Sequence, residues 1–360
     1  MDNPYPPASF SPAPGAQPPP HPPRRRPLSF WLALFFGGCS VLAGVVILVM
    51  FLTFGSAPGI GPKGPAEFQE QVVEGSGRDR IVWLPIHGVL MHAEGGGFFP
   101  QPDLIERTTQ ALKQAGDDPR VKAVILDVDS PGGGVTESDQ IHHAVELLQK
   151  DHGKKVVVLM GDVAASGGYY LSAGADLILA HPTTITGSIG VISQFMNFEA
   201  LSEKIGVKME TVKSVKFKDI GSGSRPMTPE DRALFQSLVD NMHKKFAGIV
   251  LDGRSKVTLP GGGAFDAAHV KAVADGRIYT ADEALANGLI DGIGYKDEAV
   301  AAARRLSGVG QATVVKYVQR PNLFDLLGAR TSAPLPSVSL DLKSVREILS
   351  PRLLFLWTAP

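Results

Sequence analysis

The chain contains two short, mainly apolar runs, each of which leads directly into a glycine-rich turn. Lys122–Val128 leads into Asp129-Ser-Pro-Gly-Gly-Gly134, and Lys154–Met160 leads into Gly161-Asp-Val-Ala-Ala-Ser-Gly-Gly168. A continuous apolar run of this length indicates a strand that is buried on both faces, as in parallel sheets covered by helices. The two glycine turns would then lie at strand ends, where open parallel sheets bind their ligands.

Strand and helix patterns alternate along most of the remaining chain, which predicts an α/β layered domain with right-handed crossovers. Further strands are expected at 81–90, 176–180, 207–215 and 312–318. Helices are expected at about 102–114, from Thr136 onward, and at about 198–205, 228–252, 264–274, 281–287 and 296–306.

The N-terminal part of the chain has a composition unlike that of a folded domain. Residues 1–27 are dominated by proline and are expected to be a disordered tail. Residues 30–54 carry no charged residue, and Arg24-Arg25-Arg26 precede them, so a single transmembrane anchor is predicted over 28–54 with the N-terminus in the cytoplasm. A cleaved signal peptide is the alternative, and the length of the apolar run disfavours it.

These patterns divide the chain into five expected parts. They are a cytoplasmic tail (1–27), an anchor (28–54), a linker (55–78), a folded domain (79–320) that lies outside the cytoplasm, and a C-terminal extension (321–360). The extension closes with the apolar run Leu353-Leu-Phe-Leu-Trp357, which we expect either to lie in a groove of the domain or to rest against the membrane.

Charge and cysteine content exclude several classes of function. The formal net charge is −1, with 35 basic and 36 acidic residues, which argues against a nucleic-acid partner. The one cysteine, Cys39, lies in the apolar run, so the folded domain has no disulfide and no thiolate nucleophile. The nine histidines form no metal-binding motif, and we expect neither a metal nor a cofactor.

Ser166 lies where the second buried strand passes into a helix, between small residues on both sides. Small neighbours let a substrate backbone approach, and the free amides of a helix start can stabilise an oxyanion. The same position suits a serine that only caps the helix. The glycine triplet 132–134 could likewise point backbone amides at one spot, whereas it lacks the lysine and hydroxyl residue of a phosphate-binding loop.

A serine nucleophile needs a base, and no histidine stands at a recognisable spacing from Ser166. A lysine can serve instead if burial lowers its pKa toward neutrality. Lys213, Lys216 and Lys218 are the candidates, and the residue pattern alone does not separate them.

From about residue 80 to 320 the chain resembles the signal peptide peptidase A (SppA) family of membrane-anchored serine–lysine proteases, in its short form. The resemblance rests on five stretches in a fixed order: Asp129-Ser-Pro-Gly-Gly-Gly134, Gly161 to Tyr170, Thr186-Gly-Ser-Ile-Gly190, Lys216-Phe-Lys-Asp-Ile220 and Asp275-Gly-Arg-Ile-Tyr279. It implies a ClpP/crotonase-like spiral of β-β-α units. It also implies homo-oligomeric rings in which the lysine reaches a neighbouring subunit's serine, and apolar peptides such as remnant signal peptides as substrates.

The resemblance also assigns roles to residues. Ser166 corresponds to the nucleophile, Lys218 to the general base, and Ser188 to the hydroxyl that orients the lysine amine. Gly133 and the amide of Ser166 correspond to the oxyanion hole, and Gly132, Gly134 and Gly167 border the substrate. The expected location is the bacterial inner membrane, with the catalytic domain on the extracytoplasmic side.

Three alternatives stay open. A related serine–lysine protease could act on one specific membrane protein, as the stomatin-cleaving proteases do. A crotonase-type acyl-CoA enzyme would share the oxyanion-hole architecture, but neither the anchor nor the serine suits it. A scaffold with a degenerate site is disfavoured by the joint presence of Ser166, Ser188 and Lys218.

Overall fold

The computed structural model describes residues 28–54, 68–92, 103–319 and 353–357. It divides into two compact units, Met1–Lys63 and Gly64–Pro360. In the first unit, α1 (Leu28–Phe54) is a single helix. Among the described residues no helix is identified as long and apolar enough to cross a membrane, so the predicted transmembrane span is not confirmed.

The second unit is built on a mixed, mostly parallel sheet of nine strands. Its main path runs β1 (Phe68–Glu74), β11 (Thr313–Gln319), β2 (Arg80–His87), β3 (Val121–Ser130), β5 (Lys155–Ala165), β6 (Leu177–Ala180) and β10 (Gly292–Ile293). From β11 to β10 all neighbours are parallel, and β1 is the antiparallel edge. The predicted α/β class with parallel crossovers is therefore confirmed.

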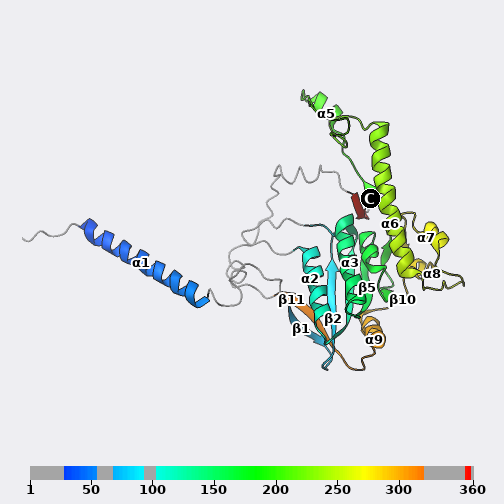
Figure 1. The fold of residues 1–360 in the computed structure, drawn as a ribbon, viewed down its shortest axis with the longest axis horizontal. Helices are drawn as coiled ribbons and strands as arrows, with labels where there is room; N and C mark the ends of the chain where they lie inside the picture. Colours follow the sequence, from blue (N-terminus) through cyan, green and yellow to red (C-terminus); the bar gives the residue numbers. More distant parts are fainter. Residues whose placement is uncertain (1–27, 55–67, 93–102, 320–352, 358–360) are drawn as a thin grey trace, which may run out of the picture. The chain divides into compact units, whose positions relative to one another are not determined.

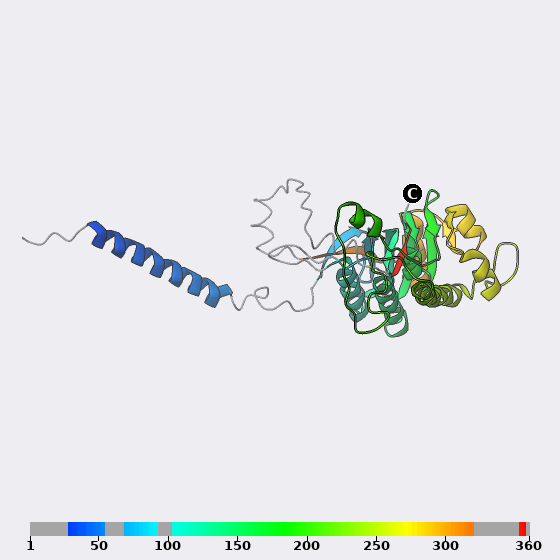
Figure 2. The same cartoon turned by 90° about the horizontal axis from the view of Figure 1, so that it is seen from above.

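Helices cover both faces of this sheet (Figures 1 and 2). Side chains of α2 (Leu104–Asp117), α3 (Val135–Lys150) and α4 (Gly167–Ser172) pack with one face, in the larger hydrophobic core. Side chains of α9 (Lys296–Ser307) pack with the other face. Successive side chains of a strand point to opposite faces of the sheet. Val82 and Leu84 of β2 therefore lie in the larger core, and Ile81 and Trp83 lie in the core on the α9 side.

The last two strands of the nine-stranded sheet branch from the end of β5, where β7 (Ile185–Gly187) joins β5 to β9 (Ile278–Thr280). A separate three-stranded sheet has β12 (Leu353–Leu356) between β4 (Gly132–Gly134) and β8 (Ile192–Ser193). The remaining helices are α5 (Glu199–Lys204), α6 (Pro229–Arg254), α7 (Ala267–Val273) and α8 (Ala281–Ala286). Figure 1 shows α5 at the end of α6 that is remote from α7 and α8.

Two expectations about elements are wrong. The expected linker contains β1, which pairs with β11 from Phe68 onward, so the sheet gains an edge strand there. The alternating segment 207–215 forms no strand, and every one of its residues is exposed. An alternating pattern makes a strand only where a neighbouring strand and a buried face are available. The described part of this chain supplies neither to 207–215.

Candidate active site

Ser166 lies between the end of β5 and the start of α4, and its backbone is strained. Its φ and ψ angles are 53° and −113°, and its side chain makes no hydrogen bond that would cap the helix. Left-handed backbone costs a residue with a Cβ about 1–2 kcal/mol, and such strain is concentrated at functional sites. The structure therefore does not support the helix-cap alternative for Ser166.

Ser188 lies beside Ser166 because their strands are paired. β5 and β7 are parallel with Ala165 opposite Gly187, so the two serines follow register partners. Ser188 also has a positive φ, 51°, and these two are the non-glycine residues with positive φ in the part of the chain that the structure describes. Both are almost fully buried.

The hydrogen bonding of Ser166 bears on the expected oxyanion hole. Its amide donates to the carbonyl of Gly187 at 2.8 Å, which ties β5 to β7. An amide that is already bound to a carbonyl is not free to receive an oxyanion, so this geometry favours a different amide from the expected one. The next amide, that of Gly167, stands in the first turn of α4, where helix amides have no intrahelical acceptor.

The glycine triplet is the strand β4, and it is paired on both sides. On one side the amide of Gly134 donates to Leu90, and Leu90 donates to the carbonyl of Gly132, at 2.8 Å each. On the other side β12 runs antiparallel, with Phe355 opposite Gly133. The chain's own residues 353–357 thus lie across the glycine turn as an extended strand.

The register of this pairing directs the Phe355 carbonyl at the glycine turns. Trp357 donates its amide to the Pro131 carbonyl at 2.9 Å. Hydrogen-bonded pairs alternate in an antiparallel ladder, which makes Gly133 and Phe355 the next such pair. The amide of Gly133 therefore faces the carbonyl oxygen of Phe355.

Gly132 and Gly167 have to be glycines for this approach. Gly132 has a φ of 96°, and a Cβ on it would overlap the Phe355 carbonyl oxygen and lie 2.6 Å from the Gly167 nitrogen. A Cβ on Gly167 would lie 3.1 Å from the same oxygen. A peptide carbonyl is thus held next to the residue that follows Ser166.

The three candidate lysines lie in an exposed series of turns before α6. Lys213 pairs with Asp219 at 2.7 Å and Lys216 pairs with Glu230 at 3.0 Å. Among the described residues no hydrogen bond or ion pair joins the side chain of Lys218 to Ser166 or to Ser188. The structure therefore brings Ser166, Ser188 and the glycine turn together, whereas Lys218 lies in an exposed turn with no such bond to the two serines.

Arg225 fixes the turn that contains Lys218 to the start of α6. Its guanidinium makes two hydrogen bonds of 3.0 Å with the Asp219 carboxylate and one of 2.5 Å with Asp231. Asp231 in turn forms a capping box with Thr228 at the start of α6. The hydrogen bonds from Arg225 and Lys213 hold the pKa of Asp219 far below its ordinary value. We call Asp219, Arg225 and Asp231 the clamp.

Comparison with known proteins identifies the family. The pattern of Peptidase family S49 matches residues 148–310. A putative signal peptide peptidase SppA of Enterococcus faecium is 36% identical over 251 residues, which cover 69% of this chain and 70% of that protein. A putative protease of Methanocaldococcus jannaschii is 32% identical over 287 residues, covering 78% of this chain and 89% of that protein.

The chain belongs to peptidase family S49. It is a serine peptidase related to the SppA proteases, as the sequence stretches indicated. Among solved structures, a ClpP1 mutant of Listeria monocytogenes matches with a TM-score of 0.37 and 13% identity, over 61% of this chain and 94% of that one.

Some residues of this S49 peptidase site could not be assigned a role from the sequence. Arg225 belongs to none of the five stretches, and the stretch Lys216–Ile220 gave no role to Asp219, because the contact between the two depends on a turn that brings them together over six residues. The Gly167 amide could have been preferred over that of Ser166 only by knowing that β7 pairs with β5. No group of three or more histidine, cysteine or acidic side chains that could hold a metal occurs in the described residues.

Proposed function

We propose that this peptidase hydrolyses apolar peptides with Ser166 as nucleophile, Lys218 as general base and Ser188 as the hydroxyl that orients the lysine. One observation carries the proposal. An extended segment of the chain lies across the glycine turn with a carbonyl oxygen beside the residue after Ser166. An acyl-CoA enzyme would have no use for a groove that pairs with a peptide backbone.

The proposed reaction is acyl transfer to serine. Neutral Lys218 takes the proton of the Ser166 hydroxyl, and the oxygen attacks the substrate carbonyl. The lysine then gives this proton to the leaving amine, and water releases the acyl group. The strained, buried position of Ser166 fixes its hydroxyl before the substrate arrives, which lowers the entropy cost of attack.

The proposed oxyanion hole consists of the amides of Gly133 and Gly167. Both lie beside the carbonyl oxygen of Phe355, and neither depends on a side chain. Backbone amides held by a sheet and a helix start do not need to reorganise when charge develops, which makes such donors effective. Gly132 and Gly134 bind Leu90 and so hold the turn in place.

We further propose that Lys218 acts on Ser166 of a neighbouring copy. The support lies in the exposed run 203–218, which includes Ile205, Val207, Met209, Val212 and Val215. Apolar side chains alternate at Ile205, Val207 and Met209, the pattern of a strand without its partner. A second copy of the chain would supply both a paired strand and a buried face.

The location that we propose is the extracytoplasmic face of a bacterial inner membrane. The support is the charge-free run 30–54 with three arginines before it. Retention of the full chain in the membrane fraction after alkaline extraction is expected. Complete release would contradict the anchor.

The test uses the full chain in detergent micelles and a fluorogenic apolar peptide. We expect Ser166→Ala and Lys218→Ala each to lower kcat by at least about 1,000-fold, since each removes a group that acts as part of one unit. Lys216→Ala is the matched control, and it should retain activity because Lys216 only pairs with Glu230 on the surface. Full activity in Lys218→Ala would overturn the assignment of the base.

A further inference from the structure

The two amides of the proposed oxyanion hole come from different elements of the fold. Gly133 belongs to β4, and Gly167 belongs to the first turn of α4. Two backbone donors stabilise an oxyanion well only if both point at the place where its charge develops. The contacts that set the distance between these amides therefore determine how well the site can stabilise the oxyanion.

The side chain of Ser138 lies between these two elements. Ser138 is one turn into α3 and fully buried, and its hydroxyl donates to the Gly134 carbonyl at the end of β4, at 2.9 Å. A Cβ on Gly167 would lie 2.4 Å from the Ser138 Oγ atom and 3.0 Å from the Gly132 Cα atom. The oxygen of Ser138 is thus hydrogen-bonded to β4 and packed against the backbone of α4.

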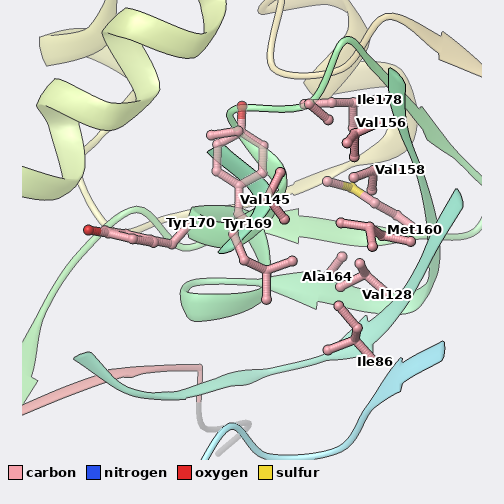
Figure 3. Close-up of a cluster of buried hydrophobic side chains, with 14 of the residues drawn as sticks. Ile86, Val128, Val145, Val156, Val158, Met160, Ala164, Tyr169, Tyr170 and Ile178 are labelled. Atoms are coloured by element: carbon pink, nitrogen blue, oxygen red, sulfur yellow. The ribbon is translucent and has the colours of Figure 1, made fainter. Parts of the chain in front are cut away.

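The bodies of α3 and α4 are held on the sheet by the larger hydrophobic core. Figure 3 shows Val145 of α3 and Tyr169 of α4 together in this core, with Met160 of β5 nearby. These contacts place the helices as a whole. The spacing of the two amides depends in addition on the contacts at the helix starts, where Ser138 lies.

A small side chain with a hydroxyl suits position 138 better than alanine or a longer residue. Alanine would remove the donor to the Gly134 carbonyl and the atom that packs against Gly167. A longer side chain would press on α4 at Gly167. Either change would move one amide relative to the other, and a hydrogen bond weakens steeply when its distance or angle is poor.

We propose that Ser138 is a positioning residue, which sets the spacing of the Gly133 and Gly167 amides and so their fit to the oxyanion. The inference rests on the proposed function and adds a residue to the same site. Ser138 takes no part in proton transfer, because its single hydroxyl proton is already donated to Gly134. Its effect should appear in the transition state, where the oxyanion is charged, and not in the binding of the substrate.

The experiment compares Ser138→Ala with Ser172→Ala in the full chain, with the fluorogenic apolar peptide. Ser172 is the matched control, since it is equally buried and donates to the carbonyl four residues before it, that of Gly168, at 2.7 Å. We expect Ser138→Ala to lower kcat about 10-fold with little change in KM, a smaller effect than the loss of an oxyanion donor. Ser172→Ala should leave kcat unchanged, although thermal unfolding should show a similar loss of stability.

A peptide boronate gives a second measurement, which does not depend on turnover. The Ser166 oxygen adds to the trigonal boron and Lys218 takes the hydroxyl proton, so the tetrahedral, negatively charged adduct resembles the transition state. The same peptide ending in a carboxamide forms no adduct and reports binding alone. We expect Ser138→Ala to weaken inhibition by the boronate about 10-fold and to leave inhibition by the carboxamide unchanged.

The results separate this inference from the proposed function. An unchanged kcat in Ser138→Ala, or an equal loss in Ser172→Ala, would overturn the inference alone. A lowered kcat with unchanged inhibition by the boronate would also overturn it, because the defect would then lie outside the oxyanion hole. If Ser166→Ala still cleaves the peptide at the unmodified rate, the proposed function itself fails.

Discussion

The surroundings of Ser166 and those of Lys218 are built in opposite ways. Ser166 and Ser188 are buried, each follows a strand of the central sheet, and backbone hydrogen bonds hold both in a strained conformation. Lys218 lies in exposed turns that no sheet supports, and the clamp between Asp219 and the start of α6 holds them. The difference supports the proposal that one chain prepares the proposed nucleophile Ser166 completely and offers the proposed base Lys218 outward, to another copy.

Weakening the clamp should lower the activity that depends on Lys218, because the clamp holds the turn that contains this lysine. Arg225→Lys keeps the charge but loses the planar fork that binds Asp219 twice. If the clamp positions Lys218, kcat should fall about 10- to 100-fold with little change in KM, because a small misplacement of a catalytic group is costly. Steady-state kinetics with the apolar peptide measure both constants.

Arg232→Lys, an exposed arginine on the first turns of α6, is the control and should behave as the unmodified protein. An unchanged kcat in Arg225→Lys would mean that the neighbouring copy, and not the clamp, holds Lys218. The pKa of Asp219 is lowered in the folded state, so its contribution to stability is present above its unfolded value and is lost only as the pH falls through the lower, folded value. The clamp should therefore persist across the neutral and basic range.

The backbone strain should be measurable as stability. At φ angles of 53° and 51°, glycine avoids the penalty that a Cβ incurs. We expect Ser166→Gly to be more stable than Ser166→Ala by about 1 kcal/mol, and the same for the two variants of Ser188. Denaturant unfolding of the purified variants gives these differences.

Ser214, in the exposed turns before Lys218, provides the contrast because it has no positive φ. There alanine should be at least as stable as glycine. Equal stability of the glycine and alanine variants at positions 166 and 188 would show that no strain is stored beside the glycine turns.

A smaller effect is expected at the outer edge of the glycine turn. His92, two residues after Leu90, pairs with Asp103 at 2.5 Å, and the hydrogen bond to Asp103 raises the pKa of His92. Its contribution is full below the unfolded pKa and is lost as the pH rises through the higher, folded value. His92→Gln should therefore destabilise the protein at pH 5.5, by no more than about 0.5 kcal/mol given the exposure of the pair.

At pH 9 the unmodified protein and His92→Gln should unfold at the same temperature. Thermal unfolding at pH 5.5 and at pH 9 measures this difference. A difference that grows with pH would contradict the assignment of the effect to protonated His92.

Most of the sheet could be predicted from the sequence because its strands are continuous apolar runs buried on both faces. The position of Ser166 at a strand end followed from the same pattern. By contrast, β1 was missed because its alternating polar residues resemble a linker, and its pairing with β11 joins residues far apart in the chain. The segment 207–215 has the pattern of a strand, yet pattern alone does not tell whether a partner strand exists.

The site divides in the same way. Ser166, Ser188 and the glycine turn lie in motifs, since their conformations are set by a few local residues. The preference for the amide of Gly167 depends on the register of β7 against β5, and the place of the Phe355 carbonyl depends on the register of β12 against β4. The clamp depends on a turn whose shape the residue pattern does not give.

The most direct test of the account mixes two inactive variants. Ser166→Ala and Lys218→Ala chains, each with a different affinity tag, would be co-expressed and purified through both tags in sequence, with assembly checked by light scattering. If the base comes from a neighbouring copy, some sites combine an intact Ser166 with an intact Lys218, and activity should return to roughly a quarter of the unmodified level. Mixed assemblies with no more activity than either variant alone would contradict the account, because serine and lysine would then have to come from one chain.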